Sequence, residues 1–185
     1  MIYISSYFSP IGELIIAAKN NYLIGLWLKN QKYYLSTILG ESINNIESEI
    51  LIKTKKWLDL YFNHQNPNIH ELNIQLIGTD FQKKVWRLLI DIPYGTITTY
   101  KEISNQLVQK FGYTKMSPQA IGSAIGRNPI SIIIPCHRVV STTGSLTGYA
   151  GGIHNKLYLL NHEKVNTANL FIPKERKKEN EPNSK

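Results

Sequence analysis

The residues with the clearest chemical potential are Cys136, the only cysteine of the chain, and His137, which follows it. Because proline fixes its own φ and biases its predecessor toward extended geometry, Pro135 is expected to place the thiol on a defined bend. The imidazole and the guanidinium of Arg138 can favour the thiolate, which is the reactive form. A lone cysteine among isoleucine and valine residues can equally be an inert buried side chain. The local sequence therefore permits a nucleophilic thiol but does not require one.

The segment from Ile134 to Val140 resembles the active-site signature of the O6-alkylguanine-DNA alkyltransferases, also called methylated-DNA:protein-cysteine methyltransferases. The match extends from about residue 79 to 164, whereas residues 1 to 77 fit the family only in length and general pattern. The other matching motifs are Ile92-Pro93-Tyr94-Gly95, Thr99-Tyr100, Asn128-Pro129, Gly144, Tyr149-Ala150-Gly151-Gly152, Lys156 and Leu159-Leu160-Asn161-His162-Glu163.

The resemblance implies a triad of nucleophile, base and orienting group. Cys136 attacks the alkyl carbon on guanine O6, and His137 takes the thiol proton through a water molecule. Glu163, expected in the last helix, orients the histidine and stabilises its charged form. Asn128 braces the active-site turn, and Tyr100 gives a proton or a strong hydrogen bond to the departing guanine. Transfer of an alkyl group from DNA to sulfur is therefore the expected chemistry.

The same resemblance implies how the alkylated base is held after it rotates out of the duplex. Backbone groups around Val139 and Ala150 contact the edge of the base, and Tyr149 and Gly151 shape the loop that closes over it. Two further residues are assigned structural roles: Pro135 and Arg138.

Nothing in the sequence suggests a way to regenerate an alkylated thiol, because there is no second cysteine, hydride source or metal motif. We therefore expect a protein that reacts once, without a cofactor or a metal. His64 and His70 lack a second pair of ligands and are interpreted as surface residues.

The basic residues of the chain are concentrated around the cysteine. Residues 1 to 77 carry six basic and six acidic side chains, residues 78 to 165 carry ten and four, and the remainder carry five and three. A basic half beside a neutral half indicates a polyanion, and nucleic acid is the usual one.

Capping signals predict helices in the basic half. Thr79 with Gln82 opens a helix that ends by Pro93, and Thr99 with Glu102 repeats the pattern for a helix through residue 107.

Ser117-Pro118 predicts a third helix, through Gly126, which with the second forms a helix-turn-helix candidate. The third helix carries Ala, Gly and Ser where base-reading helices carry long polar side chains. The resemblance implies that it enters the minor groove; tight packing inside the domain is the alternative. The candidate DNA contacts are Gln119, Ala120, Gly122, Ser123, Lys101 and Arg127.

Gln119 departs from the family pattern. Several relatives carry an arginine there, which fills the space left by the flipped nucleotide, so the aid to base flipping is the uncertain part of the resemblance.

The N-terminal half alternates in a strand-like way over residues 3–8, 13–18 and 22–28, which predicts a small antiparallel sheet. Apolar residues at helical spacing, among them Ile46 and Tyr61, predict a helix from residue 45 to residue 62, and residues 71–77 look like one more strand.

Together these patterns predict an α+β protein. Residues 1–77 are expected to form a ribonuclease H-like α/β domain, and residues 78–165 a mainly helical, winged-helix-like DNA-binding domain with a helix-turn-helix. The charged tail of residues 166–185 is expected to be disordered.

The expected partner is double-stranded DNA that carries alkylated guanine, and no obligate protein partner is expected for what should be a monomer. No apolar run approaches the ~20 residues that span a bilayer, and no signal peptide is recognisable, so a cytoplasmic location is expected. Three other functions remain open: a lesion-binding alkyltransferase-like protein, a Cys-His hydrolase of the papain kind and a helix-turn-helix regulator.

Overall fold

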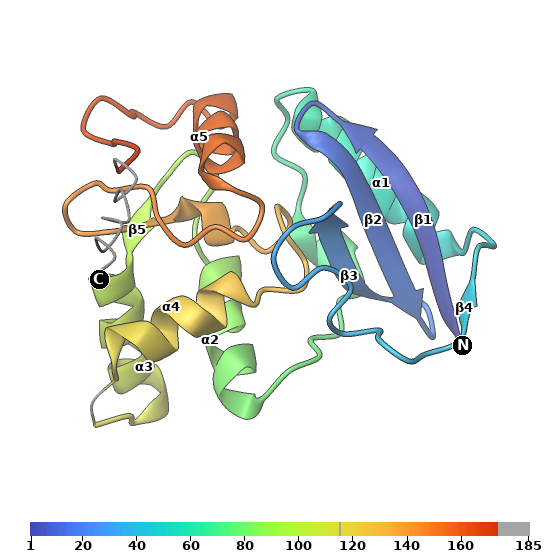
Figure 1. Cartoon of the computed structure of the whole chain (residues 1–185), viewed down its shortest axis with the longest axis horizontal. Coiled ribbons are helices and arrows are strands. Elements are labelled where there is room, and N and C mark those ends of the chain that lie inside the picture. The colour runs from blue at the N-terminus through green and yellow to red at the C-terminus, as the bar shows by residue number, and fades with distance from the viewer. Residues whose placement is uncertain (115, 174–185) are drawn as a thin grey trace, which may run out of the picture.

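The computed structural model describes residues 1–114 and 116–173. Its N-terminal part holds β1 (Ile2–Ser9), β2 (Gly12–Lys19) and β3 (Tyr22–Leu28), which follow the predicted strands closely and pair as antiparallel neighbours (Figure 1). A short strand, β4 (Ile43–Asn44), pairs in parallel with β1, so the order is β3-β2-β1-β4. The sheet is therefore mixed, and the prediction of a purely antiparallel sheet is wrong in this respect.

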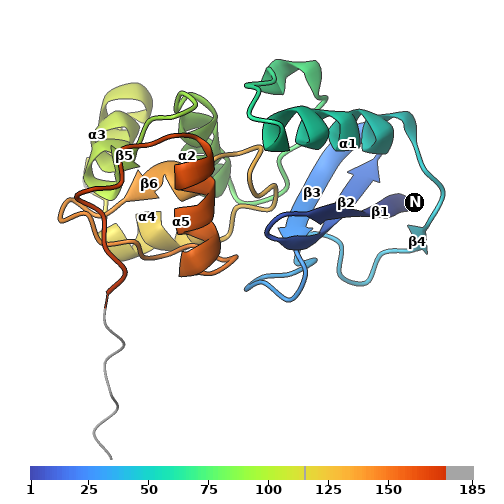
Figure 2. The ribbon, with the colours of Figure 1, turned by 90° about the horizontal axis from the view of Figure 1, so that it is seen from above.

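Each face of this sheet carries a buried hydrophobic cluster. Leu14 and Ile16 of β2 point to the face covered by α1 (Glu49–Phe62), where they share a hydrophobic cluster with Leu58 (Figure 2). Ala17 belongs to a separate cluster on the opposite face, together with Ile38 from the connection between β3 and β4. This division follows the period of two along a strand.

Two N-terminal predictions need correction. Helix α1 begins at Glu49 rather than near residue 45, and Ile46, which fits the helical period, is 64% exposed. The segment 71–77 is not a strand: a short 3-10 helix, η1 (Ile69–Glu71), is followed by a single parallel bridge between Ile74 and Leu23 of β3. The segment therefore runs beside the start of β3 only at residues 73–75, where Asn73 O accepts from Leu23 N and Gln75 N donates to Leu23 O.

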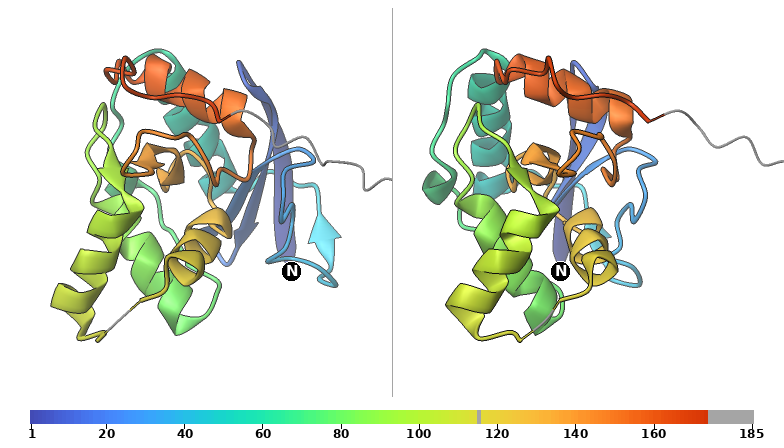
Figure 3. Two further views of the ribbon diagram at one scale, coloured as in Figure 1. Left: turned by 60° about the vertical axis from the view of Figure 1, so that its left-hand side comes forward. Right: turned by 90° about the vertical axis from the view of Figure 1, so that its left-hand side faces the viewer.

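The C-terminal part is mainly helical. It comprises α2 (Asp80–Ile90), β5 (Thr98–Thr99), α3 (Tyr100–Phe111), α4 (Pro118–Gly126), η2 (Cys136–Arg138), β6 (Val139–Val140) and α5 (Ile153–His162). Strands β5 and β6 form a separate two-stranded parallel sheet. Helix α5 lies over the turn of residues 136–140 in all views (Figure 3).

The predicted helix starts are confirmed by the capping geometry. Thr79 and Gln82 form both bonds of a capping box, whereas Thr99 accepts a bond only from the N–H of Glu102. Ser117 caps α4 by accepting from the N–H of Ala120. Helix α3 runs four residues beyond the predicted end and stops before Gly112, because residues 108–111 continue the helical pattern.

The two parts share one hydrophobic core. Leu14 and Leu58 of the N-terminal part lie in the same buried cluster as Leu89, Ile125 and Leu159 of the C-terminal part, which also includes Cys136. The apolar stretch before the cysteine, which looks strand-like in sequence, contacts β3 through one bridge between Ile130 and Leu26 and otherwise forms turns. Backbone bonds of 2.8 Å from Leu26 N to Pro129 O and from Ser131 N to Leu26 O fix this contact.

Part of the tail is ordered. Phe171 accepts a bond from Leu146 N at 2.9 Å and donates one to Gly144 O at 3.1 Å. The prediction of disorder is therefore wrong for residues 166–173, and its remainder, residues 174–185, lies outside the described residues. Among the residues that the structure describes, no helix is long and apolar enough to cross a membrane.

Replacing Thr79 with Ala should lower the free energy of unfolding by about 1 kcal/mol, because the N–H of Gln82 loses its acceptor. Urea denaturation measures the change. Arg87→Ala removes an exposed side chain from the same helix and should cost less than about 0.5 kcal/mol. Equal losses in the two variants would show that the cap does not stabilise α2.

Candidate active site

The thiol of Cys136 is held inside the protein on the 3-10 turn η2 and is only 5% exposed. Asn128, which follows α4, fixes this turn. Its Nδ2 donates to Ile134 O at 2.7 Å and to Cys136 Sγ at 3.2 Å, and its Oδ1 accepts from Ile130 N at 3.0 Å. A single amide therefore sets the position of the sulfur and solvates its charged form.

The thiol is protonated at rest. Burial raises the pKa of Cys136, and the bond from Asn128 and the positive charge of Lys156 lower it by less. A nucleophile in this position needs a base that can take its proton.

His137 has the properties that such a base requires. It is fully buried, and its Nε2 lies 2.6 Å from Oε1 of Glu163. Because a carboxylate can only accept, Nε2 carries the proton and Nδ1 of the neutral ring is free to accept one. Among the described residues, Nδ1 has no hydrogen-bond partner. Burial lowers the pKa of His137, and this effect outweighs that of Glu163, which raises the pKa. The ring is therefore neutral at pH 7.

Glu163 lies directly after the last residue of α5, rather than within the helix as predicted, and its carboxylate is buried. Oε2 accepts from Arg138 Nε at 2.8 Å and from Gly95 N at 3.2 Å. Oε1 accepts from His137, from Arg138 Nη2 at 3.0 Å and from the hydroxyl of Tyr61 at 2.8 Å. Burial raises the pKa of this carboxyl, but the bonds and charges of His137 and Arg138 outweigh burial and hold it well below the ordinary value. Glu163 is therefore an anion at neutral pH.

Tyr100, the first residue of α3, donates to Thr147 O at 3.0 Å. Burial, and then the nearby Cys136, raise the pKa of Tyr100 to about 12, so the phenol stays protonated. Lys156 of α5 donates to the same carbonyl at 2.8 Å and to Val139 O at 2.6 Å. Its ammonium thus joins the strand after the cysteine to the loop that carries Thr147.

This loop passes very close to Tyr100. Gly148 has a φ of +74°, and a Cβ at this position would lie 2.5 Å from the Tyr100 hydroxyl oxygen, so only glycine fits. Two cavities of about 370 Å³ lie near this site, one lined in part by Tyr100 and the other in part by the loop itself. The first is lined by Tyr100, Lys101, Ser104, Met116, Pro118, Ile121, Ser141 and Thr142, and the second by Lys32, Tyr33, Gly122, Ser123, Gly126, Gly148, Tyr149 and Ala150.

The residues expected to contact DNA lie mostly on the outside. Gln119, Ser123 and Arg127 are exposed at spacings of four along α4, Lys101 is exposed on α3, and Ala120 and Gly122 are partly buried. The residues expected to touch the base are buried or partly buried around the cysteine: Val139, Tyr149, Ala150 and Gly151.

Three contacts of the N-terminal part were not foreseen from the sequence. Lys32 N donates to Ala150 O at 3.2 Å, the guanidinium of Arg127 lies 4.3 Å from the ring centre of Tyr33, and Tyr61 donates to Glu163. The helical period marked Tyr61 only as an apolar position, and no local signal identifies its partner. Lys156 was visible only as a motif residue. Within the described part of the chain, no group of three His, Cys, Asp or Glu residues could hold a metal ion.

Two family models match the chain. The model for the 6-O-methylguanine DNA methyltransferase ribonuclease-like domain matches residues 2–76, and the model for the DNA binding domain of the same protein matches residues 80–165.

Individual relatives match over most of the chain. A methylated-DNA–protein-cysteine methyltransferase of Mycobacterium leprae is 38% identical over 164 residues, which are 89% of this chain and 93% of the relative. The Methanosarcina barkeri protein of the same description is 40% identical over 159 residues, covering 85% and 94%. A crystal structure of Mycobacterium tuberculosis OGT in complex with DNA aligns with a TM-score of 0.75 at 34% identity, covering 88% and 92%.

Replacing Lys156 with Met should raise the pKa of the Cys136 thiol, because the ammonium charge that favours the thiolate is lost. It should also lower the free energy of unfolding by roughly 1–3 kcal/mol, because Val139 O loses the bond from the ammonium and Thr147 O keeps only the bond from Tyr100. The pH dependence of thiol alkylation by iodoacetamide measures the first effect. Lys164→Met, at an exposed position, is the matched control. An unchanged thiol titration in Lys156→Met would show that this ammonium does not act on the sulfur.

Proposed function

Since this chain belongs to the 6-O-methylguanine DNA methyltransferase family, with its DNA repair activity and its DNA-binding domain, we propose that Cys136 is the residue that receives the alkyl group. The observation that carries the proposal is the buried thiol, which accepts a bond from Asn128 and precedes a neutral histidine bound to Glu163. These are the parts that a nucleophile, its base and its orienting group require.

The reaction proceeds by displacement at a saturated carbon. The thiol proton passes to Nδ1 of His137 through a water molecule, and the sulfur then attacks the alkyl carbon on guanine O6. A carbon–sulfur bond forms as the carbon–oxygen bond breaks, and the electron pair of the carbon–oxygen bond stays on the guanine oxygen. The imidazolium that forms next to the buried Glu163 anion is stabilised by that charge.

Tyr100 assists departure of the guanine. Its phenol is protonated and close enough to the sulfur for Cys136 to raise its pKa. In the resting protein it donates to Thr147 O, so it must exchange this acceptor for the base. Lys156 already donates to the same carbonyl, which therefore keeps a partner when Tyr100 turns away.

The substrate is double-stranded DNA with an O6-alkylated guanine that is rotated out of the helix. A relative has been crystallised with DNA, and exposed Gln119, Ser123 and Arg127 of this chain form a suitable face of α4. The loop of residues 147–151 and the backbone near Val139 then hold the base. We also propose that the protein acts as a monomer inside the cell, where its substrate lies.

Replacing Cys136 with Ser should abolish alkyl transfer and leave lesion binding largely intact, because a hydroxyl is a poor nucleophile at neutral pH. Intact mass spectrometry after mixing with DNA that contains O6-methylguanine measures the transfer. The unchanged protein should gain one methyl group on the peptide that contains Cys136, and the reaction should stop at one equivalent. A lesion-binding protein would gain no mass, and a Cys-His hydrolase would continue to turn over.

Replacing Gln119 with Arg should strengthen DNA binding, because a cation and a planar group are added at the exposed start of α4. The slope of log affinity against log salt should steepen by about one unit if a new phosphate contact forms. Transfer from duplex DNA should gain more than transfer from single strands, where little stacking has to be replaced. Equal effects on both strand forms, or no effect, would show that position 119 does not assist flipping.

A further inference from the structure

Tyr61 brings the N-terminal part of the chain into direct contact with the proposed catalytic carboxylate. It lies in the last turn of α1, is 1% exposed, and donates its hydroxyl to Oε1 of Glu163 at 2.8 Å. Its own carbonyl accepts a bond of 2.7 Å from Nε2 of His162, the residue before Glu163. Two bonds in opposite directions therefore join this residue of α1 to the end of α5.

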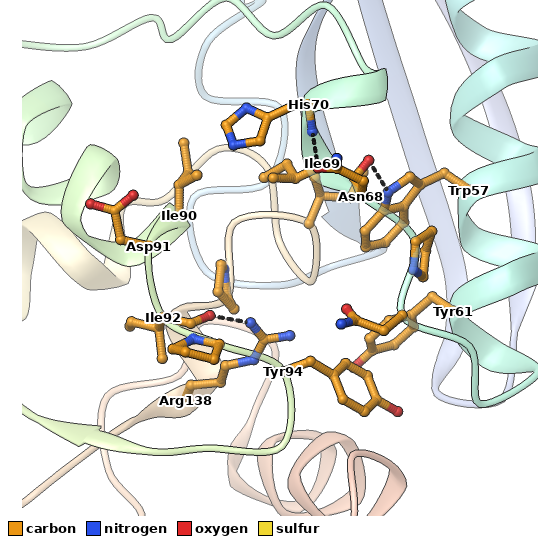
Figure 4. A pocket seen from close by; sticks show the side chains of 15 residues that line it. Trp57, Tyr61, Asn68, Ile69, His70, Ile90, Asp91, Ile92, Tyr94 and Arg138 are labelled. Atoms are coloured by element: carbon orange, nitrogen blue, oxygen red, sulfur yellow. Dashed lines mark hydrogen bonds between the residues drawn. The ribbon is translucent and has the colours of Figure 1, made fainter.

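Aromatic packing fixes the ring of Tyr61. Trp57 stacks on it at 5.6 Å with 10° between the planes, and Tyr94 meets it edge-on at 6.1 Å. Figure 4 shows Trp57 and Tyr61 on one side of a pocket lined by both parts of the chain, with Tyr94 beside Tyr61 and Arg138 across from Trp57. No residue of α4 lines this pocket.

The hydroxyl of Tyr61 donates at every relevant pH. Burial, and then the charge of Glu163, raise its pKa well above the ordinary value for tyrosine. It shares Oε1 with His137 and with Arg138 Nη2, while Arg138 Nε and Gly95 N occupy Oε2. A carboxylate offers about four acceptor sites. The acceptor sites of the carboxylate are thus fully occupied, and Tyr61 is the donor to Oε1 that comes from the N-terminal part of the chain.

We propose that Tyr61 is a positioning residue for alkyl transfer: it holds Oε1 of Glu163 where that oxygen orients His137. The inference rests on the proposed roles of Cys136, His137 and Glu163. It gives the N-terminal domain a part in the reaction, although that domain contributes neither the nucleophile nor the base.

Tyr61→Phe tests the proposal, because it removes only the hydroxyl. Transfer in a single-turnover experiment yields two separate quantities: the amplitude counts the folded, competent molecules, and the rate constant describes each of them. We expect the rate constant to fall roughly tenfold, as for the loss of one hydrogen bond to a charged group. The amplitude and the affinity for DNA should stay the same.

The pH dependence of the transfer rate constant is a second measurement. It would stay unchanged if Tyr61 only stabilised the fold. The charged and titratable groups around His137 and Glu163 are Arg138, Lys156, Cys136, Tyr61, Tyr94 and Tyr149. Without the Tyr61 donor, Oε1 carries more negative charge toward His137 and raises the pKa of that imidazole. Because the reaction needs the neutral ring, the acid side of the rate profile should move to higher pH in Tyr61→Phe.

Tyr94→Phe is the matched control. Tyr94 belongs to the same aromatic cluster, but its hydroxyl donates to the backbone oxygen of His162, at 3.4 Å, and not to Glu163. Its rate constant and its acid limb should match those of the unchanged protein.

A double-mutant cycle with Glu163→Gln decides whether Tyr61 acts through the carboxylate. In the Glu163→Gln background, Tyr61→Phe should slow transfer no further. A lower amplitude with an unchanged rate constant and acid limb, or full additivity in the cycle, would overturn the proposal and leave Tyr61 as a packing residue.

Failure of the proposed function would look different, because the unchanged protein would then not be methylated on Cys136.

Discussion

The Glu163 carboxylate is the point on which the site depends. A buried anion without partners costs several kcal/mol, and Glu163 is stable because groups from α1, from the turn after α2 and from η2 all donate to it. Its charge in turn settles which nitrogen of His137 carries the proton. Through this anion, three segments that are far apart in the sequence determine the state of the residue beside the thiol.

The thiol itself is set by a second network with a different origin. Asn128, which belongs to the C-terminal part of the chain, holds the turn of Cys136 by hydrogen bonds. The bridge between Ile130 and Leu26 attaches the segment before this turn to β3. The thiol of Cys136 is therefore positioned against the N-terminal sheet, while the ring of His137 is positioned through Glu163 against α5 and α1. Lys156 joins Val139, in the strand that follows these two residues, to Thr147 in the neighbouring loop.

Features encoded by neighbouring residues could be predicted from the sequence. The starts of α2, α3 and α4 depend on capping side chains within four residues. The three long strands depend on the alternation of apolar and polar residues along each segment. The predictions of a strand over residues 71–77 and of disorder from residue 166 were wrong where these segments contact residues distant in the sequence. Ile74 pairs with Leu23 at the start of β3, and Phe171 pairs with Ser145. The roles of Glu163 and Tyr100 came from family resemblance. The bond from Tyr61 to Glu163 spans 102 residues, and no pattern in either segment points to the other.

The shared hydrophobic core has a thermodynamic consequence. Two family models divide the chain near residue 78, yet Leu58, Leu89, Ile125 and Leu159 belong to a single buried cluster that the division would cut. Melting either half exposes the apolar surface of the other and removes a donor or an acceptor from the Glu163 network. We therefore expect the two halves, although they match separate family models, to unfold as one cooperative unit.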